Sequence, residues 1–85
     1  MPHIVMYTSA SCPLCINAER LLLNRGVKQI DKIRVDLEPQ LRLEMMEKTG
    51  RRTVPQIYID ERHIGGFAEL RALDLAGELH LLLAA

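Results

Sequence analysis

The sequence predicts an α/β fold in which a four-stranded mixed sheet is flanked by helices, in the order β-α-β-α-β-β-α. Short apolar runs alternate with segments of helical apolar spacing, and two short strand-like runs lie side by side before the last helical segment. A strand–helix–strand unit requires a parallel pair with a right-handed crossover, and a hairpin adds an antiparallel pair. The 85 residues are enough for one domain, 1–85, and not for two.

The first half of the chain is expected to hold two strands and two helices. His3–Tyr7 is apolar and ends at a polar run, which suits a buried strand. After the cysteine pair, apolar residues recur at helical spacing, and Gly26 is well placed to end that helix. Ile30–Asp36 alternates weakly and predicts the second strand. A second helix is expected from Pro39, which a first helical turn tolerates, to Gly50.

The second half is expected to form a hairpin and a C-terminal helical region. Gln56–Ile59 and Arg62–Ile64 are separated by a polar two-residue turn, which predicts two antiparallel strands. Phe67–Ala76 has helical spacing, and Gly77 can cap it. Glu78–Leu83 adds a last helical turn or two whose leucines reach the core.

Composition limits the functions that this chain can have. Lys and Arg number 11, as do Asp and Glu, and no basic stripe or acidic tail stands out, so no nucleic-acid partner is expected. No apolar run is long enough for a signal peptide or a membrane span. We therefore expect a cytoplasmic protein, in which two cysteines serve redox or metal chemistry rather than a permanent disulfide.

The spacing of Cys12 and Cys15 gives the two thiols different roles. If Pro13 occupies the first helical turn, Cys12 lies at the helix N-terminus, where unpaired N–H groups and the helix dipole favour a thiolate. Cys15 then lies one turn later and faces inward. We expect Cys12 to be the nucleophile and Cys15 to resolve the disulfide that it forms.

A metal site is the alternative reading of this cysteine pair. A four-ligand zinc site needs two further ligands, and the chain has no other cysteine. The histidines, His3, His63 and His80, fall in a strand start, a hairpin and the C-terminal helix, where they are expected to be surface or edge residues. No metal is expected.

Four segments together resemble the glutaredoxin family, most closely its small bacterial dithiol class (glutaredoxin 3-like). They are Tyr7-Thr8, Cys12-Pro13-Leu14-Cys15, Thr53-Val54-Pro55-Gln56-Ile57 and Ile64-Gly65-Gly66. The resemblance covers essentially the whole chain. It implies a thioredoxin-like fold and an enzyme that uses glutathione as reductant and co-substrate to reduce disulfide-bonded and glutathionylated proteins.

The resemblance also implies roles for particular residues. Pro55 is expected to be cis and to face Cys12, and the backbone of Val54 to pair with the cysteinyl part of glutathione like an added strand. Gly66 begins a stretch whose N–H groups hold the γ-glutamyl carboxylate, and Glu69 is expected to meet the amino group. The full set expected to bind glutathione is Tyr7, Leu14, Arg52, Thr53, Val54, Pro55, Gly66, Phe67, Ala68 and Glu69.

The sequence departs from the family pattern at several of these places. Leu14 stands where tyrosine is usual, Ser9 where a lysine is usual, and Ala68 where an acidic residue is usual. Arg51 or Arg52 could supply the missing positive charge. Each lost contact at a partly exposed site costs about 0.5–1 kcal/mol, so we expect glutathione affinity to be lower by about ten-fold, with the thiol chemistry unchanged.

Two other functions are alternatives to this one. A thioredoxin-like reductase fed by a flavoprotein would usually show a tryptophan before its first cysteine, and this chain has no tryptophan. An iron–sulfur carrier would bridge a 2Fe–2S cluster in a dimer, but family members that do so mostly have a single-cysteine motif or a small residue in place of Pro13. We expect a monomer that carries no cluster.

Overall fold

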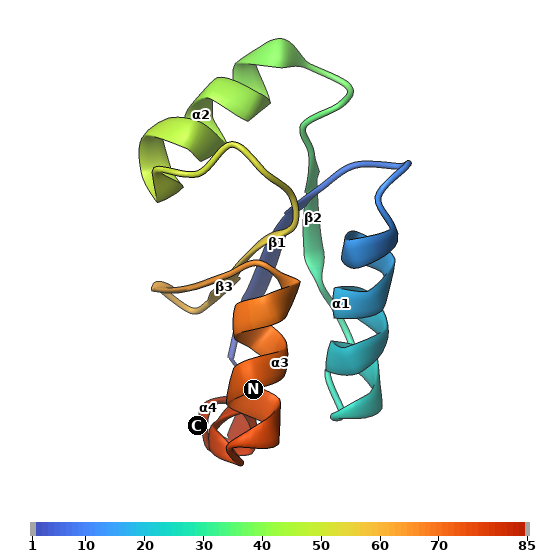
Figure 1. Ribbon diagram of the computed structural model, residues 1–85, viewed down its shortest axis with the longest axis vertical. Coiled ribbons are helices and arrows are strands. Elements are labelled where there is room, and N and C mark those ends of the chain that lie inside the picture. Colours follow the sequence, from blue (N-terminus) through green and yellow to red (C-terminus); the bar gives the residue numbers. More distant parts are fainter. Residues whose placement is uncertain (1, 85) are drawn as a thin grey trace.

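The computed structural model describes residues 2–84 and confirms the predicted order of elements (Figure 1). The four strands form one sheet in the order β2-β1-β3-β4. β1 runs parallel to β2 and antiparallel to β3, and β3 and β4 are antiparallel, so the mixed four-stranded sheet is confirmed. The elements are β1 (Ile4–Thr8), α1 (Pro13–Asn24), β2 (Asp31–Arg34), α2 (Pro39–Thr49), β3 (Gln56–Ile59), β4 (Arg62–Gly65), α3 (Phe67–Leu75) and α4 (Glu78–Ala84).

The period of two along the strands divides the core into two layers. From β1, Met6 points to one face, where it packs with residues of α1, α3 and α4. Tyr7 points to the other face, where it packs with Met45 of α2 and Tyr58 of β3. Helices therefore cover both faces of the sheet: α1, α3 and α4 pack on one face, and α2 packs on the other.

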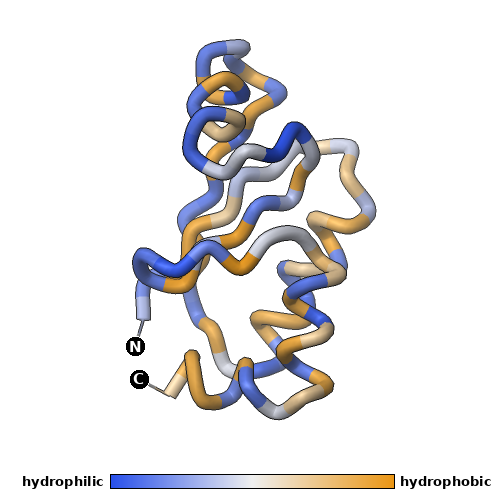
Figure 2. The backbone as a smooth tube through the Cα atoms, turned by 60° about the vertical axis from the view of Figure 1, so that its left-hand side comes forward, coloured by the Kyte–Doolittle hydropathy of each residue, from blue (hydrophilic) through white to orange (hydrophobic). Residues whose placement is uncertain are grey.

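The hydropathy of the residues along the chain agrees with the position of the core. Figure 2 shows hydrophobic positions along the strands and in the C-terminal helices, and hydrophilic positions at the connecting turns. The larger core cluster contains Ile4, Met6, Ala18, Leu22, Val27, Ile57, Ile59, Ile64, Leu70 and Leu79. Within residues 2–84, no helix is long and apolar enough to cross a membrane.

The end of β2 differs from the predicted one because side-chain hydrogen bonds replace strand pairing there. β2 ends at Arg34 instead of Asp36, although Val35 N–H still donates to the carbonyl oxygen of Thr8 across 3.0 Å. Asp36 turns back and accepts two hydrogen bonds from the Arg34 guanidinium, both 2.7 Å long. At the end of α2, Gly50 has φ +73°, the left-handed conformation that favours glycine, and the predicted stop is confirmed.

Candidate functional site

Cys12 is the N-cap residue of α1. Its backbone is extended, with φ −123° and ψ 102°, and Pro13 occupies the first helical turn, where its missing N–H leaves no donor unpaired. The N–H of Cys15 donates to Cys12 Sγ across 3.1 Å. The sulfur thus takes the place of the oxygen that usually caps a helix, and it receives a backbone N–H and the positive end of the dipole.

The two thiols are both free and differ in their surroundings. Cys15 is 3% exposed, and its burial raises the pKa of its thiol; a hydrogen bond with Cys12 adds to the rise, while contacts with Thr8 and Ser9 oppose it. Cys12 is 9% exposed, which is less open than the sequence suggested for an attacking sulfur. The arrangement confirms that Cys15 lies behind Cys12, facing inward.

The segment before β3 covers the Cys12 sulfur. The Cys12 thiol donates to the carbonyl oxygen of Val54, with a sulfur–oxygen distance of 3.7 Å. The Val54–Pro55 peptide is cis, as the family resemblance implied. In Figure 1 this segment passes from α2 to the centre of the sheet, close to the first turns of α1 and α3.

The loop that leads into Cys12 is tied to the end of β2. Ala10 N–H donates to Asp36 Oδ2 across 3.3 Å, and the Arg34 guanidinium holds the pKa of Asp36 well below its ordinary value. Lys32, on the same strand, is paired with Glu19 at 2.6 Å. The two cations nearest to Ser9 on β2 are therefore already matched by carboxylates.

A carboxylate of the chain itself occupies the N-terminus of α3. Gly66 N–H donates to Glu69 Oε1 across 2.7 Å, and the Arg51 guanidinium reaches the same oxygen at 3.1 Å. The Gly66 N–H, followed by the Arg51 contact, holds the pKa of Glu69 below its ordinary value. Within residues 2–84, no group accepts from the N–H of Phe67 or Ala68, which lie in the first turn of the helix.

Two glycines make room for this arrangement. Gly65 has φ +111°, and a Cβ at this position would lie 2.5 Å from Glu69 Oε1. A Cβ on Gly66 would lie 3.3 Å from the carbonyl oxygen of Pro55. Of the three N–H groups where the sequence analysis predicts an anion, those of Gly66, Phe67 and Ala68, the first donates to Glu69.

The other residues predicted to form the site are placed as follows. Leu14 is half exposed on α1, two residues from Cys12. Arg51 reaches Glu69, whereas the recorded contact of Arg52 is through its carbonyl oxygen, which accepts from Arg42 at 3.1 Å. Tyr7 is only 5% exposed and meets Tyr58 edge-on, so most of its ring belongs to the core beneath the site.

Two further polar residues near the site, Gln56 and His63, were not among the predicted site residues. Gln56 is fully buried, and it joins the carbonyl oxygen of Thr53 to the ring of His63 through two hydrogen bonds. A glutamine at the start of an otherwise apolar strand was the available signal. His63 gave none, because alternation alone places it on an open face of the hairpin.

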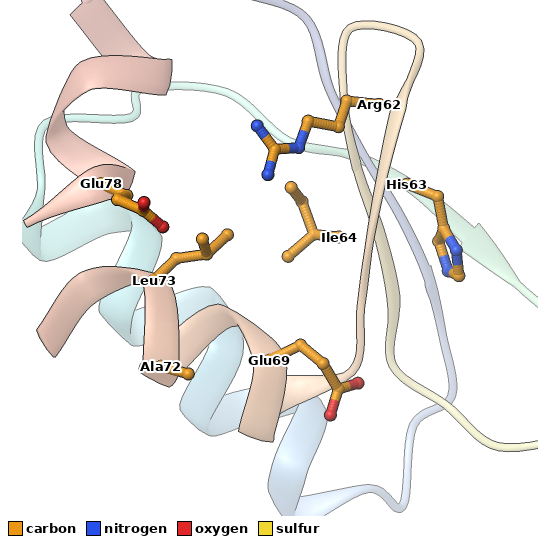
Figure 3. Close-up of a pocket in the computed structure, with 7 residues that line it drawn as sticks. All are labelled: Arg62, His63, Ile64, Glu69, Ala72, Leu73 and Glu78. Carbon is orange, nitrogen blue, oxygen red and sulfur yellow. The ribbon is translucent and has the colours of Figure 1, made fainter. Parts of the chain in front are cut away.

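A hollow of about 270 Å³ between β4, α3 and α4 lies outside this site. Figure 3 shows Ile64 and Leu73 pointing into it, while the Glu69 carboxylate points away. Four of its seven lining residues are charged or polar (Arg62, His63, Glu69 and Glu78), three are apolar, and neither cysteine is part of it. Within residues 2–84, no three His, Cys, Asp or Glu side chains are grouped so that they could hold a metal ion.

Comparisons with known sequences agree on one family. The family model described as Glutaredoxin matches residues 4–64. A protein named Glutaredoxin from Pseudomonas aeruginosa is 49% identical over 85 residues, which is all of both chains. Glutaredoxin 3 from Escherichia coli is 43% identical over 83 residues, covering 98% of this chain and 99% of the relative.

Solved structures give the same result for the fold. The solution structure of Glutaredoxin from Brucella melitensis superposes with a TM-score of 0.85 at 41% identity, over 98% of this chain and 89% of the other. The crystal structure of a buckwheat glutaredoxin–glutathione complex superposes with a TM-score of 0.89 at 26% identity, over 98% of this chain and 77% of the other. The thioredoxin-like fold is therefore confirmed.

Proposed function

The chain belongs to the glutaredoxin family of thiol–disulfide oxidoreductases, and we propose that it uses glutathione to reduce glutathionylated and disulfide-bonded proteins in the cytoplasm. The observation that carries the proposal is Cys12 Sγ at the N-cap of α1, with the N–H of Cys15 3.1 Å away. That geometry gives Cys12, the more exposed of the two cysteines, a backbone donor and the positive end of the α1 dipole. Residues 1–85 act in this proposal as one domain and one monomer.

The first step is attack on a mixed disulfide. The Cys12 thiolate attacks the glutathione sulfur, a Cys12–glutathione disulfide forms, and the protein substrate leaves as a thiolate that takes up a proton. Two electrons pass from Cys12 to the substrate sulfur. The reaction therefore needs only that the substrate disulfide lie in line with Cys12 Sγ.

The second step restores the enzyme. A second glutathione, as thiolate, attacks the glutathione sulfur of the intermediate, which gives oxidised glutathione and free Cys12. When the substrate is an intramolecular protein disulfide, Cys15 attacks Cys12 instead, the substrate leaves reduced, and a Cys12–Cys15 disulfide remains. Glutathione then reduces that disulfide. The buried Cys15 is suited to this resolving role because it lies one helical turn from Cys12, with its N–H 3.1 Å from Cys12 Sγ.

We propose that glutathione binds between Cys12 and the N-terminus of α3, along the segment that precedes β3. The extended backbone at Val54 would pair with the cysteinyl part, and the N–H groups of Phe67 and Ala68 would receive the γ-glutamyl carboxylate. Glu69 would accept from the amino group, with Arg51 beside it. The remaining proposed contacts are Leu14, Arg52, Thr53, Pro55, Gly66 and the exposed edge of Tyr7.

The buckwheat protein of the same fold supports glutathione as the ligand, since it was crystallised as a glutathione complex. The test is turnover of a glutathionylated peptide with glutathione, coupled to glutathione reductase. We expect turnover that saturates with the peptide and that is lost in Cys12→Ser. Activity that requires thioredoxin reductase and not glutathione would contradict the proposal.

A further inference from the structure

We propose that Gln56 and His63 are positioning residues that aim the Val54 N–H at the backbone of a bound glutathione-containing disulfide. The inference rests on the proposed function and adds residues to it that touch neither glutathione nor a cysteine. It is carried by a directed chain of hydrogen bonds and by the planarity of one peptide group.

The direction of the hydrogen bonds is fixed by their last acceptor. Gln56 Nε2 lies 2.9 Å from the carbonyl oxygen of Thr53, which can only accept, so the amide NH₂ of Gln56 must face it. Gln56 Oε1 must then face His63 Nε2, 2.8 Å away, and this nitrogen must carry a hydrogen. The chain therefore runs from His63 through Gln56 to Thr53 with every donor and acceptor assigned.

Because the Thr53–Val54 peptide group is planar, fixing the Thr53 carbonyl also fixes the direction of the Val54 N–H. The Thr53–Val54 peptide is trans, so the Thr53 carbonyl and the Val54 N–H point in opposite directions within one plane. Since Gln56 holds the carbonyl on the protein side, the N–H faces outward. Within residues 2–84, no group accepts from that N–H. The next carbonyl along, that of Val54, lies over Cys12 Sγ.

The supporting side chains are themselves fixed. In the register of β3 and β4, Tyr58 pairs with His63, and their rings lie 5.0 Å apart between centroids with a tilt of 32°. Lys48 Nζ lies 4.5 Å from the centre of the Tyr58 ring on the same face of the sheet. Figure 3 shows His63 and Ile64 on opposite sides of β4, so His63 is turned away from the core beneath α3.

The full burial of Gln56 indicates that this residue does more than fill space in the core. Its side chain is 0% exposed, and a buried amide is tolerated only with its hydrogen bonds made. An apolar residue of similar size would fill the same space in an otherwise apolar strand. The backbone it holds lies beside the reactive sulfur, which supports a role in positioning the substrate.

The test compares two disulfides that differ in whether they offer a peptide backbone. The reduced protein is mixed with oxidised glutathione, which has amides on either side of its sulfurs, and with dithiobis(nitrobenzoate), which has none. The ratio of the two second-order rate constants isolates backbone recognition from thiolate reactivity. For Gln56→Leu we expect this ratio to fall about five-fold, the usual weight of one hydrogen bond, with the aryl disulfide rate unchanged.

Further variants separate positioning from folding. His63→Phe keeps the ring on Tyr58 and removes the donor, so its ratio should fall by about two-fold because water can replace a donor at this exposed position. His63→Gln retains a donor and should keep the wild-type ratio. Ile57→Val destabilises the neighbouring core position without touching the chain of hydrogen bonds, and its ratio should not change.

The outcomes distinguish this inference from the proposed function. If the ratio of the two rate constants for wild-type protein is no larger than the same ratio for free cysteine as the attacking thiol, the proposed function fails. If the wild-type ratio is larger and folded Gln56→Leu keeps it in full, Gln56 does not position the site and the inference is overturned.

Discussion

The N–H of Cys15 donates to Cys12 Sγ across 3.1 Å, while the Cys15 sulfur is buried one helical turn behind. One turn of α1 thus supports the attacking sulfur with a backbone donor and keeps the second thiol within its reach. The proline between them leaves the first turn without a competing donor. The division of work between the thiols follows from helix geometry.

Substitution of each cysteine should separate the two reactions. Cys12→Ser removes the nucleophile, and we expect it to abolish reduction of both glutathionylated and dithiol substrates. Cys15→Ser should keep reduction of a glutathionylated peptide and lose most of its activity on an intramolecular protein disulfide. Steady-state assays with both substrates measure this, and equal losses in the two variants would contradict the assigned roles.

Alkylation should distinguish the thiols without any substrate. Burial raises the pKa of Cys15, and only 3% of the residue is exposed, so little of its thiolate is available to a reagent at neutral pH. Iodoacetamide should therefore modify the reduced protein once, at Cys12, as peptide mass mapping would show. Comparable labelling of Cys15 in the folded protein would be inconsistent with the structure.

Much of the fold could be predicted because local signals agree with the tertiary structure. Pro39 and Gly50 bracket α2, and the continuous apolar run of β1 supplies residues to both core layers. Asp36 was predicted within a strand and instead binds Arg34 and Ala10. The end of this strand depends on hydrogen bonds with residues outside it, and the apolar pattern of the strand does not indicate them.

The site was predictable only in part for the same reason. The cysteine spacing places both sulfurs on α1 through local geometry alone. The choice between Arg51 and Arg52 depends on the path of a loop, and the structure brings Arg51 to Glu69. The contact of Gln56 with His63 joins two strands of a hairpin, and a polar residue in a strand does not indicate its partner.

The stability of α2 should depend on one side chain. Met45 is the fully buried residue of this helix, at 0% exposure, whereas Leu43 is 57% exposed. Met45→Ala should lower the free energy of unfolding by about 2–4 kcal/mol through lost burial and a cavity. Leu43→Ala should change it by no more than about 0.5 kcal/mol. Urea unfolding with an unchanged m-value tests this, and equal costs would mean that α2 packs differently.

Restoring an aromatic ring at position 14 should tighten substrate binding. Leu14 is 51% exposed at the start of α1, so a tyrosine there would fit without disturbing the core and could lie against glutathione. An added aromatic contact of about 0.5–1 kcal/mol should lower KM for a glutathionylated peptide about two- to five-fold, with kcat unchanged. Ile16→Tyr, at 48% exposure on the same helix, is the matched control and should leave KM unchanged. A KM that does not move in Leu14→Tyr would place the ligand elsewhere.

Glu69 should contribute stability that depends on pH. Its carboxylate accepts from Gly66 N–H and pairs with Arg51, so the folded protein lowers its pKa from the ordinary 4.5. A lowered carboxyl pKa means that the unfolded chain binds the proton more tightly, so the contribution is full above about pH 4.5 and is lost as the pH falls through the folded pKa.

Comparison with Glu69→Gln isolates this contribution, because glutamine retains the oxygen that accepts from Gly66. The difference in unfolding free energy between wild type and variant should be about 0.5 kcal/mol near neutral pH, since the Arg51 pair is half exposed, and should shrink towards zero on acidification. Glu47→Gln, an exposed site on α2, controls for the loss of one negative charge. A Glu69→Gln difference that stays constant from neutral pH into the acid range would show that the carboxylate charge at α3 does not stabilise the folded protein.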